Sequence, residues 1–378
     1  MTRVGLRGVT VKACCKWLGL LGVLTLFLSG GPALAQGAAK MQRLPQSSPI
    51  LPFQWIDVHV HPVAGRGGAA DVYASVSAAA EAMKEAGIAK MIVMPPPMES
   101  GMPALFDVEE LRQATREYGS RFAMLGGGAS LNAMIQSAGK EATLSGAVRE
   151  RFEQRAMEIL KGGALGFGEI TAHHLSLEAG HPYERVAADH PILLLLADIA
   201  ARNDAVIELH FDVVARDMAI PEGLANPSNP ASLAANLPEL ERLLAHNRQA
   251  RLVWAHAGSD MLGHWTVDLS RRLLKEHPNL YMSLRMAPGR QPENHPLTPS
   301  GEVKPGWRAL LDEFSDRFVI GGDQFFVAPG LRGGPAAVFA QRSAIVRQRT
   351  ALFLAALPEP LARKIGYANA IRIYRIKN

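Results

Sequence analysis

Eight apolar runs of strand length, each followed by a stretch with helical periodicity, constrain the fold of this 378-residue chain more than any other feature. Regular alternation of this kind predicts repeated βα units around a parallel sheet. Eight such units close a barrel, so the sequence predicts an α/β protein with the (β/α)₈ TIM-barrel architecture. The apolar runs cover residues 55–60, 90–94, 121–125, 163–170, 205–210, 251–256, 280–284 and 318–322. The helical stretches cover residues 72–86, 108–118, 147–160, 192–201, 239–247, 268–276, 306–314 and 336–357.

The amino-terminal segment has the composition of a secretory signal peptide. Four basic residues precede or border the apolar residues 18–28, and an Ala-Leu-Ala triplet ends the segment at residue 35. We therefore expect residues 1–35 to be a signal peptide, residues 36–52 a linker and residues 53–378 the barrel domain. An uncleaved anchor is the alternative, but the apolar run is short for a spanning helix. We expect a periplasmic or secreted protein without stable membrane insertion after cleavage.

Charge and cysteine content narrow the class of protein further. The chain has 40 basic and 35 acidic residues, a formal net charge of +5. Four of the basic residues and none of the acidic ones lie in the predicted signal peptide, so the remaining chain carries a net charge of +1. Without a basic stripe, nucleic acid is not an expected partner. Cys14 and Cys15, the two cysteines, also lie in that segment, so no disulfide or thiolate nucleophile is expected in the mature chain.

Two histidines one residue apart lie at the end of the first apolar run. Strand alternation places His59 and His61 on the same face. Neutral imidazole is the commonest side-chain metal ligand, so the pair predicts half of a site for a divalent metal.

Single polar residues end four later runs: Glu169, His210, His256 and Asp323. A lone histidine at a strand end is more often structural than a ligand. However, the carboxyl ends of the strands of a (β/α)₈ barrel meet at one face, where catalytic groups lie. Five strand ends in this order therefore predict a shared metal site at the mouth of the barrel.

These residues and their order resemble the amidohydrolase superfamily of metal-dependent barrels. The late segment Asn369-Ala370-Ile371-Arg372 also resembles the closing Asn-Ala-x-Arg motif of the amidohydrolase-related branch, which contains hydrolases and non-oxidative decarboxylases. The similarity extends from about Trp55 to Tyr374 and is specific for fold and metal, not for substrate. It rests on Asp57-Val58-His59-Val60-His61, Gly168-Glu169, His210, Ala255-His256 and Gly322-Asp323.

The resemblance implies a site for one or two divalent ions, with zinc as the first choice and manganese as the second. Its ligands would be His59, His61, Glu169, His210, His256 and Asp323. In the two-ion arrangement Glu169 bridges the ions, because a carboxylate can span ions about 3.5–4 Å apart. In the one-ion arrangement His256 is free to polarise a carbonyl group.

The implied reaction is hydrolysis of an amide, ester or lactone bond in a small molecule by metal-bound hydroxide. Asp323 would orient the water and take its proton, and His256 is the second expected catalytic residue. Arg285 is expected to hold a substrate carboxylate, with an ion pair to the buried Glu208 as its alternative role. By strand parity, Asp57 is expected to accept the second N–H of a ligand histidine, with a purely structural contact equally open.

Other functions compete with hydrolysis. One is non-oxidative decarboxylation of an aromatic or unsaturated acid, another is phosphoester cleavage, and a third is a periplasmic binding protein without turnover. Three long connections, at residues 126–146, 211–238 and 287–305, are expected to rise over the mouth, and the second to be ordered only in part. His173 and His174 are expected in a solvated loop, with at most one of them facing the pocket. A homodimer is compatible with the amphipathic outer helices.

Overall fold

The computed structural model describes residues 49–63, 69–98, 106–177, 181–287, 289–328 and 335–377. The predicted signal peptide and most of the predicted linker therefore lie outside the described residues. Within these ranges, no helix has the length and apolar character needed to cross a membrane.

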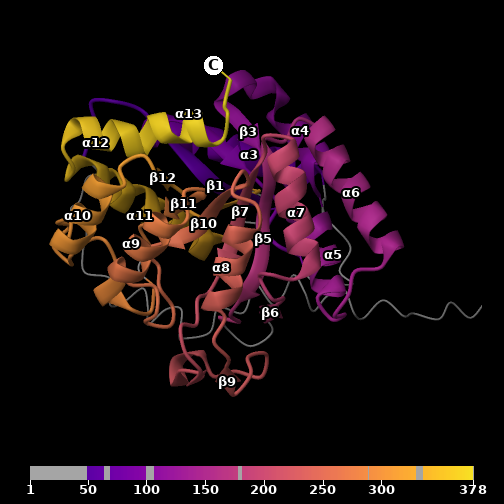
Figure 1. Cartoon of the computed structure of the whole chain (residues 1–378). Helices are drawn as coiled ribbons and strands as arrows, with labels where there is room; N and C mark the ends of the chain where they lie inside the picture. The colour runs from indigo at the N-terminus through magenta and orange to yellow at the C-terminus, as the bar shows by residue number, and fades with distance from the viewer. Residues whose placement is uncertain are drawn as a thin grey trace, which may run out of the picture.

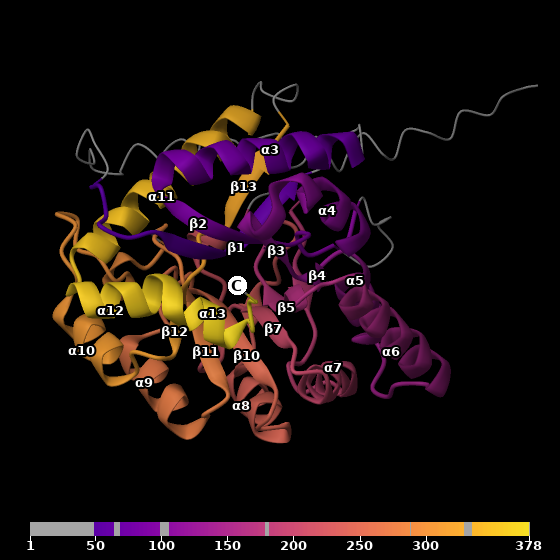
Figure 2. The same cartoon turned by 90° about the horizontal axis from the view of Figure 1, so that it is seen from above.

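A closed ring of parallel strands forms the centre of the structure (Figures 1 and 2). Two of its eight strands are interrupted: β3 continues into β4 after Leu125, and β12 continues into β13 after residues 321–323. Because β13 pairs with β1 and every other neighbouring pair is also parallel, the ring closes and the predicted (β/α)₈ barrel is confirmed. The strands are β1 (Trp55–Val63), β2 (Ile88–Val93), β3 (Phe122–Met124), β4 (Gly126–Gly127), β5 (Gly166–His174), β7 (Val206–Phe211), β10 (Arg251–Ala257), β11 (Leu280–Leu284), β12 (Phe318–Ile320) and β13 (Gln324–Val327).

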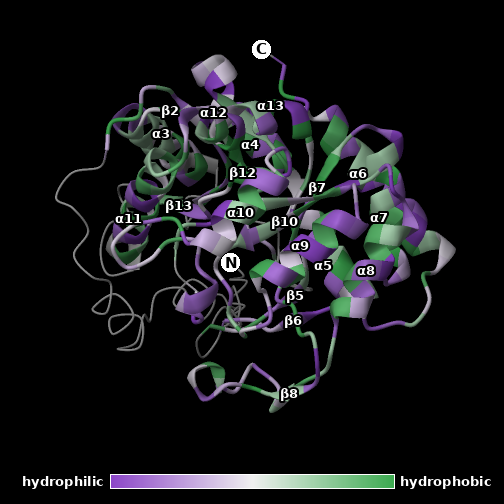
Figure 3. Cartoon of the chain, turned by 60° about the vertical axis from the view of Figure 1, so that its left-hand side comes forward, coloured by the Kyte–Doolittle hydropathy of each residue, from purple (hydrophilic) through white to green (hydrophobic). Residues whose placement is uncertain are grey.

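Helices surround the strands, as the view in Figure 2 shows. Many of them are amphipathic, and hydrophobic and hydrophilic segments alternate along them in Figure 3. In α9, for example, Leu273 and Leu274 are buried, whereas Arg271 pairs with Glu313 of the neighbouring helix at the surface. The outer helices are α3 (Ala69–Ala86), α4 (Val108–Thr115), α5 (Ser130–Ala138), α6 (Gly146–Lys161), α7 (Pro191–Arg202), α8 (Leu237–His246), α9 (Val267–Glu276), α10 (Pro305–Glu313) and α11 (Pro335–Ala355). Short 3₁₀ helices cover Arg116–Arg121, Glu222–Leu224 and Pro292–Asn294.

The last part of the chain closes the amino end of the barrel. Helix α12 (Glu359–Arg363), a π-helical turn (Lys364–Ala368) and α13 (Asn369–Ile373) lie across this end, beside the labelled carboxyl terminus in Figure 1. The Asn369 amide donates hydrogen bonds to the carbonyl groups of Ser315 and Phe318, both at 2.8 Å. The Asn-Ala-x-Arg segment therefore anchors the closing helix beside β12.

The opposite end of the barrel carries the long connections, including β6 (Glu184–Arg185) and the hairpin of β8 (Met218–Ala219) and β9 (Ser232–Leu233). The expectation that residues 211–238 are ordered only in part is wrong, because every residue of this connection is described. Its side chains close around a small apolar cluster that also includes residues of two neighbouring loops. The connection at residues 126–146 contains helix α5.

Candidate metal centre

The six predicted strand-end residues meet at the carboxyl end of the barrel. His59 and His61 lie on β1 and are fully buried, and Glu169 on β5 is 3% exposed. His210 lies on β7, His256 on β10, and Asp323 follows β12. The side chains of these three residues are only 12%, 8% and 12% exposed, respectively. The whole group is therefore screened from bulk water.

The carboxylate of Glu169 lies between two pairs of histidines. Its Oε2 atom is 3.4 Å from His59 Nε2 and 3.2 Å from His61 Nε2. Its Oε1 atom is 2.9 Å from His210 Nδ1 and 3.1 Å from His256 Nε2. Each oxygen therefore faces its own imidazole pair, which is the geometry required of a carboxylate that bridges two cations.

Hydrogen bonds at Nδ1 orient the rings of His59 and His61. His59 Nδ1 is 2.9 Å from Glu208 Oε1, and His61 Nδ1 is 3.1 Å from the Met94 carbonyl oxygen. Since these oxygens accept, both Nδ1 atoms donate, and in the neutral rings that bind a metal the Nε2 lone pairs would point into the site. The residues that face one another there fit a divalent cation, because neutral imidazole nitrogens and carboxylate oxygens are all lone-pair donors to a metal.

Electrostatics also require positive charge in this site. Burial disfavours protonated His59, but Glu169 and Glu208 outweigh that effect and hold the pKa of His59 well above its usual range. Burial opposes ionisation of Glu169, yet the charge of His59 and the hydrogen bonds from His210 and His256 hold its pKa well below the usual range. Glu169 therefore remains charged, and a bound divalent cation would supply the compensation that protonated histidines supply without it.

Asp323 joins the site opposite Glu169. Its Oδ1 atom is 3.4 Å from His61 Nε2, and its Oδ2 atom forms an ion pair with Arg285 Nη2 at 2.9 Å. Burial raises its pKa, but Arg285 and His61 outweigh this and keep the pKa of Asp323 far below its usual range. The group is thus an ionised acceptor at neutral pH.

Two of the site residues have left-handed backbone conformations. The φ angle is +74° at His256 and +50° at Asp323, although neither residue is glycine. Such conformations cost free energy and persist where the surrounding structure requires them, commonly at functional sites. Burial lowers the pKa of His256 to about 4, so its imidazole is neutral, and its Nδ1 atom has no hydrogen-bond partner among the described residues.

Two sets of residues satisfy the spacing of metal ligands within the described part of the chain: His59, Glu169 and His256, and His59, His61 and Asp323. His210 adds a fourth imidazole, with Nδ1 3.2 Å from His256 Nε2. Thus all six residues proposed from the sequence as ligands are brought together.

Of the two roles that the sequence left open for Asp57, the structure shows the purely structural one. Asp57 accepts hydrogen bonds from the backbone N–H groups of His59 and Gly322 and from the Gln324 amide, and within the described residues no hydrogen bond joins it to a ligand side chain. It ties β1 to the turn between β12 and β13, where a Cβ atom at residue 322 would lie 2.5 Å from Asp57 Oδ2 and only glycine fits. The supporting carboxylate is Glu208 instead.

Arg285 does not pair with Glu208, so the alternative role considered for it is wrong. The acceptor groups of Glu208 are filled by His59, Ser283 and Tyr374. The guanidinium group of Arg285 lies beside Asp323, and its Nε atom has no hydrogen-bond partner among the described residues. One N–H group of this cation is therefore unpaired among the described residues.

The expected solvated loop at His173 and His174 is wrong. Strand β5 extends to His174, with a register shift between Thr171 and His173. His173 is buried, whereas the His174 ring packs edge-on against His210, with ring centroids 4.2 Å apart. The ring centroids of His181 and His174 are 4.8 Å apart. The register shift leaves no signal in the sequence. Strand parity alone therefore could not have shown that His174 packs against His210.

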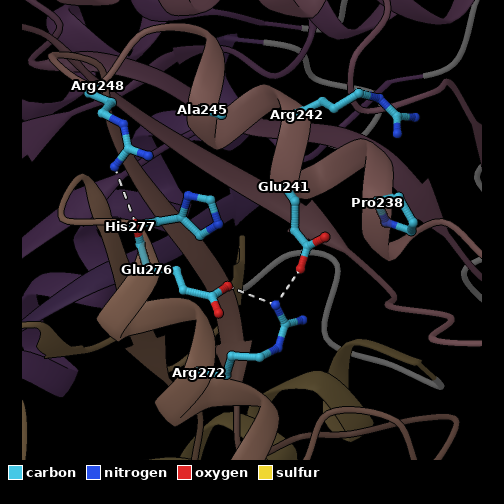
Figure 4. A pocket seen from close by; sticks show the side chains of 8 residues that line it. All are labelled: Pro238, Glu241, Arg242, Ala245, Arg248, Arg272, Glu276 and His277. Carbon is cyan, nitrogen blue, oxygen red and sulfur yellow. Dashed lines mark hydrogen bonds and ion pairs between the residues drawn. The ribbon is translucent and has the colours of Figure 1, made fainter.

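A shallow outer groove of about 430 Å³ lies between α8 and α9, lined by none of the six candidate ligands (Figure 4). Arg272 pairs there with Glu241 at 2.6 Å and with Glu276 at 2.8 Å. Because these charges already compensate one another, the groove offers no comparable reactive centre. Its lining residues are Pro238, Glu241, Arg242, Ala245, Arg248, Arg272, Glu276 and His277.

A closed parallel barrel that gathers four histidines and two carboxylates at its mouth defines a TIM-barrel protein with a candidate site for a divalent metal. The family model described as Amidohydrolase matches residues 56–376. The chain therefore belongs to the amidohydrolase family, which confirms the resemblance inferred from the sequence.

Solved structures with similar folds include enzymes of several activities. Dihydroorotase from Saccharomyces cerevisiae, in complex with 5-fluoroorotic acid, is 13% identical with a TM-score of 0.49, over 86% of this chain and 85% of that one. An Acinetobacter baumannii protein described as a probable 2-pyrone-4,6-dicarboxylic acid hydrolase is 13% identical with a TM-score of 0.47. The match covers 85% of this chain and 100% of that one. Identities this low leave reaction and substrate to be argued from this chain's own residues.

A third similar structure is 5-carboxyvanillate decarboxylase from Novosphingobium aromaticivorans, complexed with manganese and 4-hydroxy-3-methoxy-5-nitrobenzoic acid. It is 13% identical with a TM-score of 0.45, over 86% of this chain and 96% of that one. The comparison with curated proteins found no match.

Proposed function

We propose that the protein is a metal-dependent hydrolase that cleaves an amide, ester or lactone bond in a small molecule. The observation that carries this proposal is the placement of Glu169, with one carboxylate oxygen facing each pair of histidines. A pair of cations held in this way suits hydrolysis, in which one water and one carbonyl group must be activated together. Zinc is the proposed metal, because imidazole and carboxylate ligands in a buried site suit it, and manganese is the alternative.

The proposed ligands follow from the contacts. His59, His61 and Asp323 would hold one ion, and His210 and His256 the other, with Glu169 between them. When bound, the metal supplies Lewis-acid chemistry, lowering the pKa of a water ligand towards neutrality and polarising the scissile carbonyl group.

Asp323 is the proposed base. Its Oδ1 atom faces the His61 side of the site and is free of Arg285, which binds Oδ2. Oδ1 would take the proton of the attacking water and then pass it to the leaving group. Arg285 fixes the carboxylate in this orientation and, through its unpaired Nε–H, would hold a carboxylate of the substrate. Neutral His256 would hydrogen-bond or ligate without adding positive charge.

Metal content tests the proposal directly. Protein purified without chelator would be analysed by plasma mass spectrometry beside a His59→Ala/His61→Ala variant, and wild-type protein would be screened with amides, esters and lactones. About two ions per chain, lost in the variant, together with hydrolytic turnover would support the proposal. No bound metal after reconstitution with zinc or manganese would overturn it and favour a binding protein.

Decarboxylation is the second candidate, favoured by the position of Arg285. A cation beside Asp323 with a spare Nε donor could hold the carboxylate of an aromatic or unsaturated acid. One ion per chain and release of carbon dioxide from such acids, without hydrolysis, would favour this reaction.

We also propose that the enzyme is exported, which rests on the basic and apolar pattern of residues 1–35. Fractionation of cells that express the full chain would test this. Recovery of a shortened chain beginning at Gln36 outside the cytoplasm supports export, and full-length protein in the cytoplasm contradicts it.

A further inference from the structure

Tyr374 comes from the carboxyl-terminal segment that closes the amino end of the barrel. Its side chain is fully buried among the residues that fill the barrel interior. Neighbours in this inner core include Val58 on β1, Val206 on β7 and Ile373 on α13. Figure 2 shows α13 lying across this end of the barrel, close to the carboxyl terminus. In such barrels the amino end commonly serves stability and the opposite end serves chemistry.

The phenol of Tyr374 nevertheless contacts Glu208, the residue that supports His59 of the candidate metal centre. Its Oη atom donates a 2.8 Å hydrogen bond to Glu208 Oε2. Glu208 Oε1 accepts from His59 Nδ1 at 2.9 Å and from Ser283 Oγ at 3.1 Å. One carboxylate thus connects the last turn of the chain to a histidine of the candidate metal centre.

The connection has a physical basis in the burial of Glu208, which is 0% exposed. A buried carboxylate needs donors on both oxygens, and the phenol is the hydrogen-bond donor found on Oε2 within the described part of the chain. Burial, together with the charge of Glu208, keeps the pKa of Tyr374 well above its usual range, so the phenol retains its proton and donates.

We propose that Tyr374 is a positioning residue for the metal centre, acting through Glu208 to fix the ring of His59 with Nε2 directed into the site. Without the phenol, Oε2 of Glu208 loses its donor and the carboxylate can rotate away from His59 Nδ1. The ring then loses the acceptor that sets its tautomer and orientation, which such partners provide for metal-binding histidines. This inference rests on the proposed metal-dependent function, because it concerns the same site.

The test is Tyr374→Phe in the full chain, which keeps the ring and removes one hydroxyl group. Zinc affinity would be measured by competition with a chromophoric chelator, and we expect a weakening of about 10-fold to 100-fold. The matched control is Ile373→Val, which loosens the same closing segment but has no hydrogen bond to Glu208, and should bind zinc as the wild type does. Near-ultraviolet circular dichroism would verify that each variant is folded.

A combined variant shows whether the effect passes through Glu208. If it does, Tyr374→Phe added to Glu208→Gln weakens zinc binding by less than threefold beyond Glu208→Gln alone. Wild-type affinity in Tyr374→Phe, or full additivity of the two substitutions, would overturn the proposal.

Histidine nitrogen NMR of the metal-free protein separates this inference from the proposed function. We expect the Nδ1–H resonance of His59 to shift in Tyr374→Phe and to remain unchanged in Ile373→Val. If the wild type binds no metal, the proposed function fails, while this resonance still reports on Tyr374. An unchanged His59 resonance in Tyr374→Phe contradicts the positioning role.

Discussion

The Nε2 atoms of His59 and His61 lie 2.9 Å apart, while the Nδ1 atom of each ring faces an oxygen acceptor behind it. Two neutral imidazoles held in this way direct lone pairs at each other, which is unfavourable unless a cation or a proton lies between them. The fold therefore holds together groups that would repel one another without added positive charge.

Metal removal is expected to destabilise the protein for this reason. After treatment with chelator, addition of zinc to 100 times its dissociation constant should raise the free energy of unfolding by about 2.7 kcal/mol. Calorimetry at increasing zinc concentrations would measure the rise in Tm. The His59→Ala/His61→Ala variant should show little rise, and an equal rise in both proteins would argue against this site.

Substitution of Glu169, the proposed bridging carboxylate, should remove one of the two proposed ions. In Glu169→Gln one oxygen acceptor becomes an amide donor, so we expect the metal content to fall by about one ion per chain and turnover to fall by more than about 100-fold. The control is Glu239→Gln, which removes a carboxylate that pairs with Arg185 away from the site. Unchanged metal content in Glu169→Gln would contradict a bridging role.

Arg285→Lys should distinguish substrate binding from support of Asp323. Lysine keeps the charge but loses the planar fork, so KM for a substrate with a carboxylate should rise about thirtyfold, equivalent to roughly 2 kcal/mol. KM for a matched uncharged ester should change little, while any effect through Asp323 lowers kcat for both substrates. Equal changes in KM for the two substrates would exclude recognition of the carboxylate by Arg285.

His295 predicts part of the pH dependence of stability. It is 2% exposed, its Nδ1 atom accepts from the Leu297 N–H, and burial lowers its pKa to about 4. Between about pH 6.5 and pH 4 the unfolded chain protonates this residue and the folded chain does not, so stability falls as the pH falls, by up to about 3 kcal/mol.

His295→Gln keeps an acceptor and a donor but does not titrate, so its stability should fall less steeply in this window. Urea unfolding of the metal-free wild type and variant at pH 7, 5.5 and 4.5 would measure the difference in slope. Parallel pH profiles would show that His295 does not contribute.

Local features of the sequence determined the barrel architecture and identified the residues that make up the candidate site. Apolar runs and helical periodicity depend on near neighbours in the chain, and all eight predicted strands have counterparts in the barrel. His59, His61 and the four later strand-end residues were recognisable because a (β/α)₈ barrel directs the carboxyl ends of its strands to one face.

Only the tertiary structure decided which groups support and surround those residues. Glu208 rather than Asp57 holds His59, His174 turns towards His210 after a register shift in β5, and Tyr374 reaches Glu208 from the other end of the barrel. The His59 and Glu208 partners are 149 residues apart, and Tyr374 is a further 166 residues along the chain. Such pairings depend on strand register, local irregularities and the closure of the barrel, which are set by packing of the whole chain and leave no local pattern in the sequence.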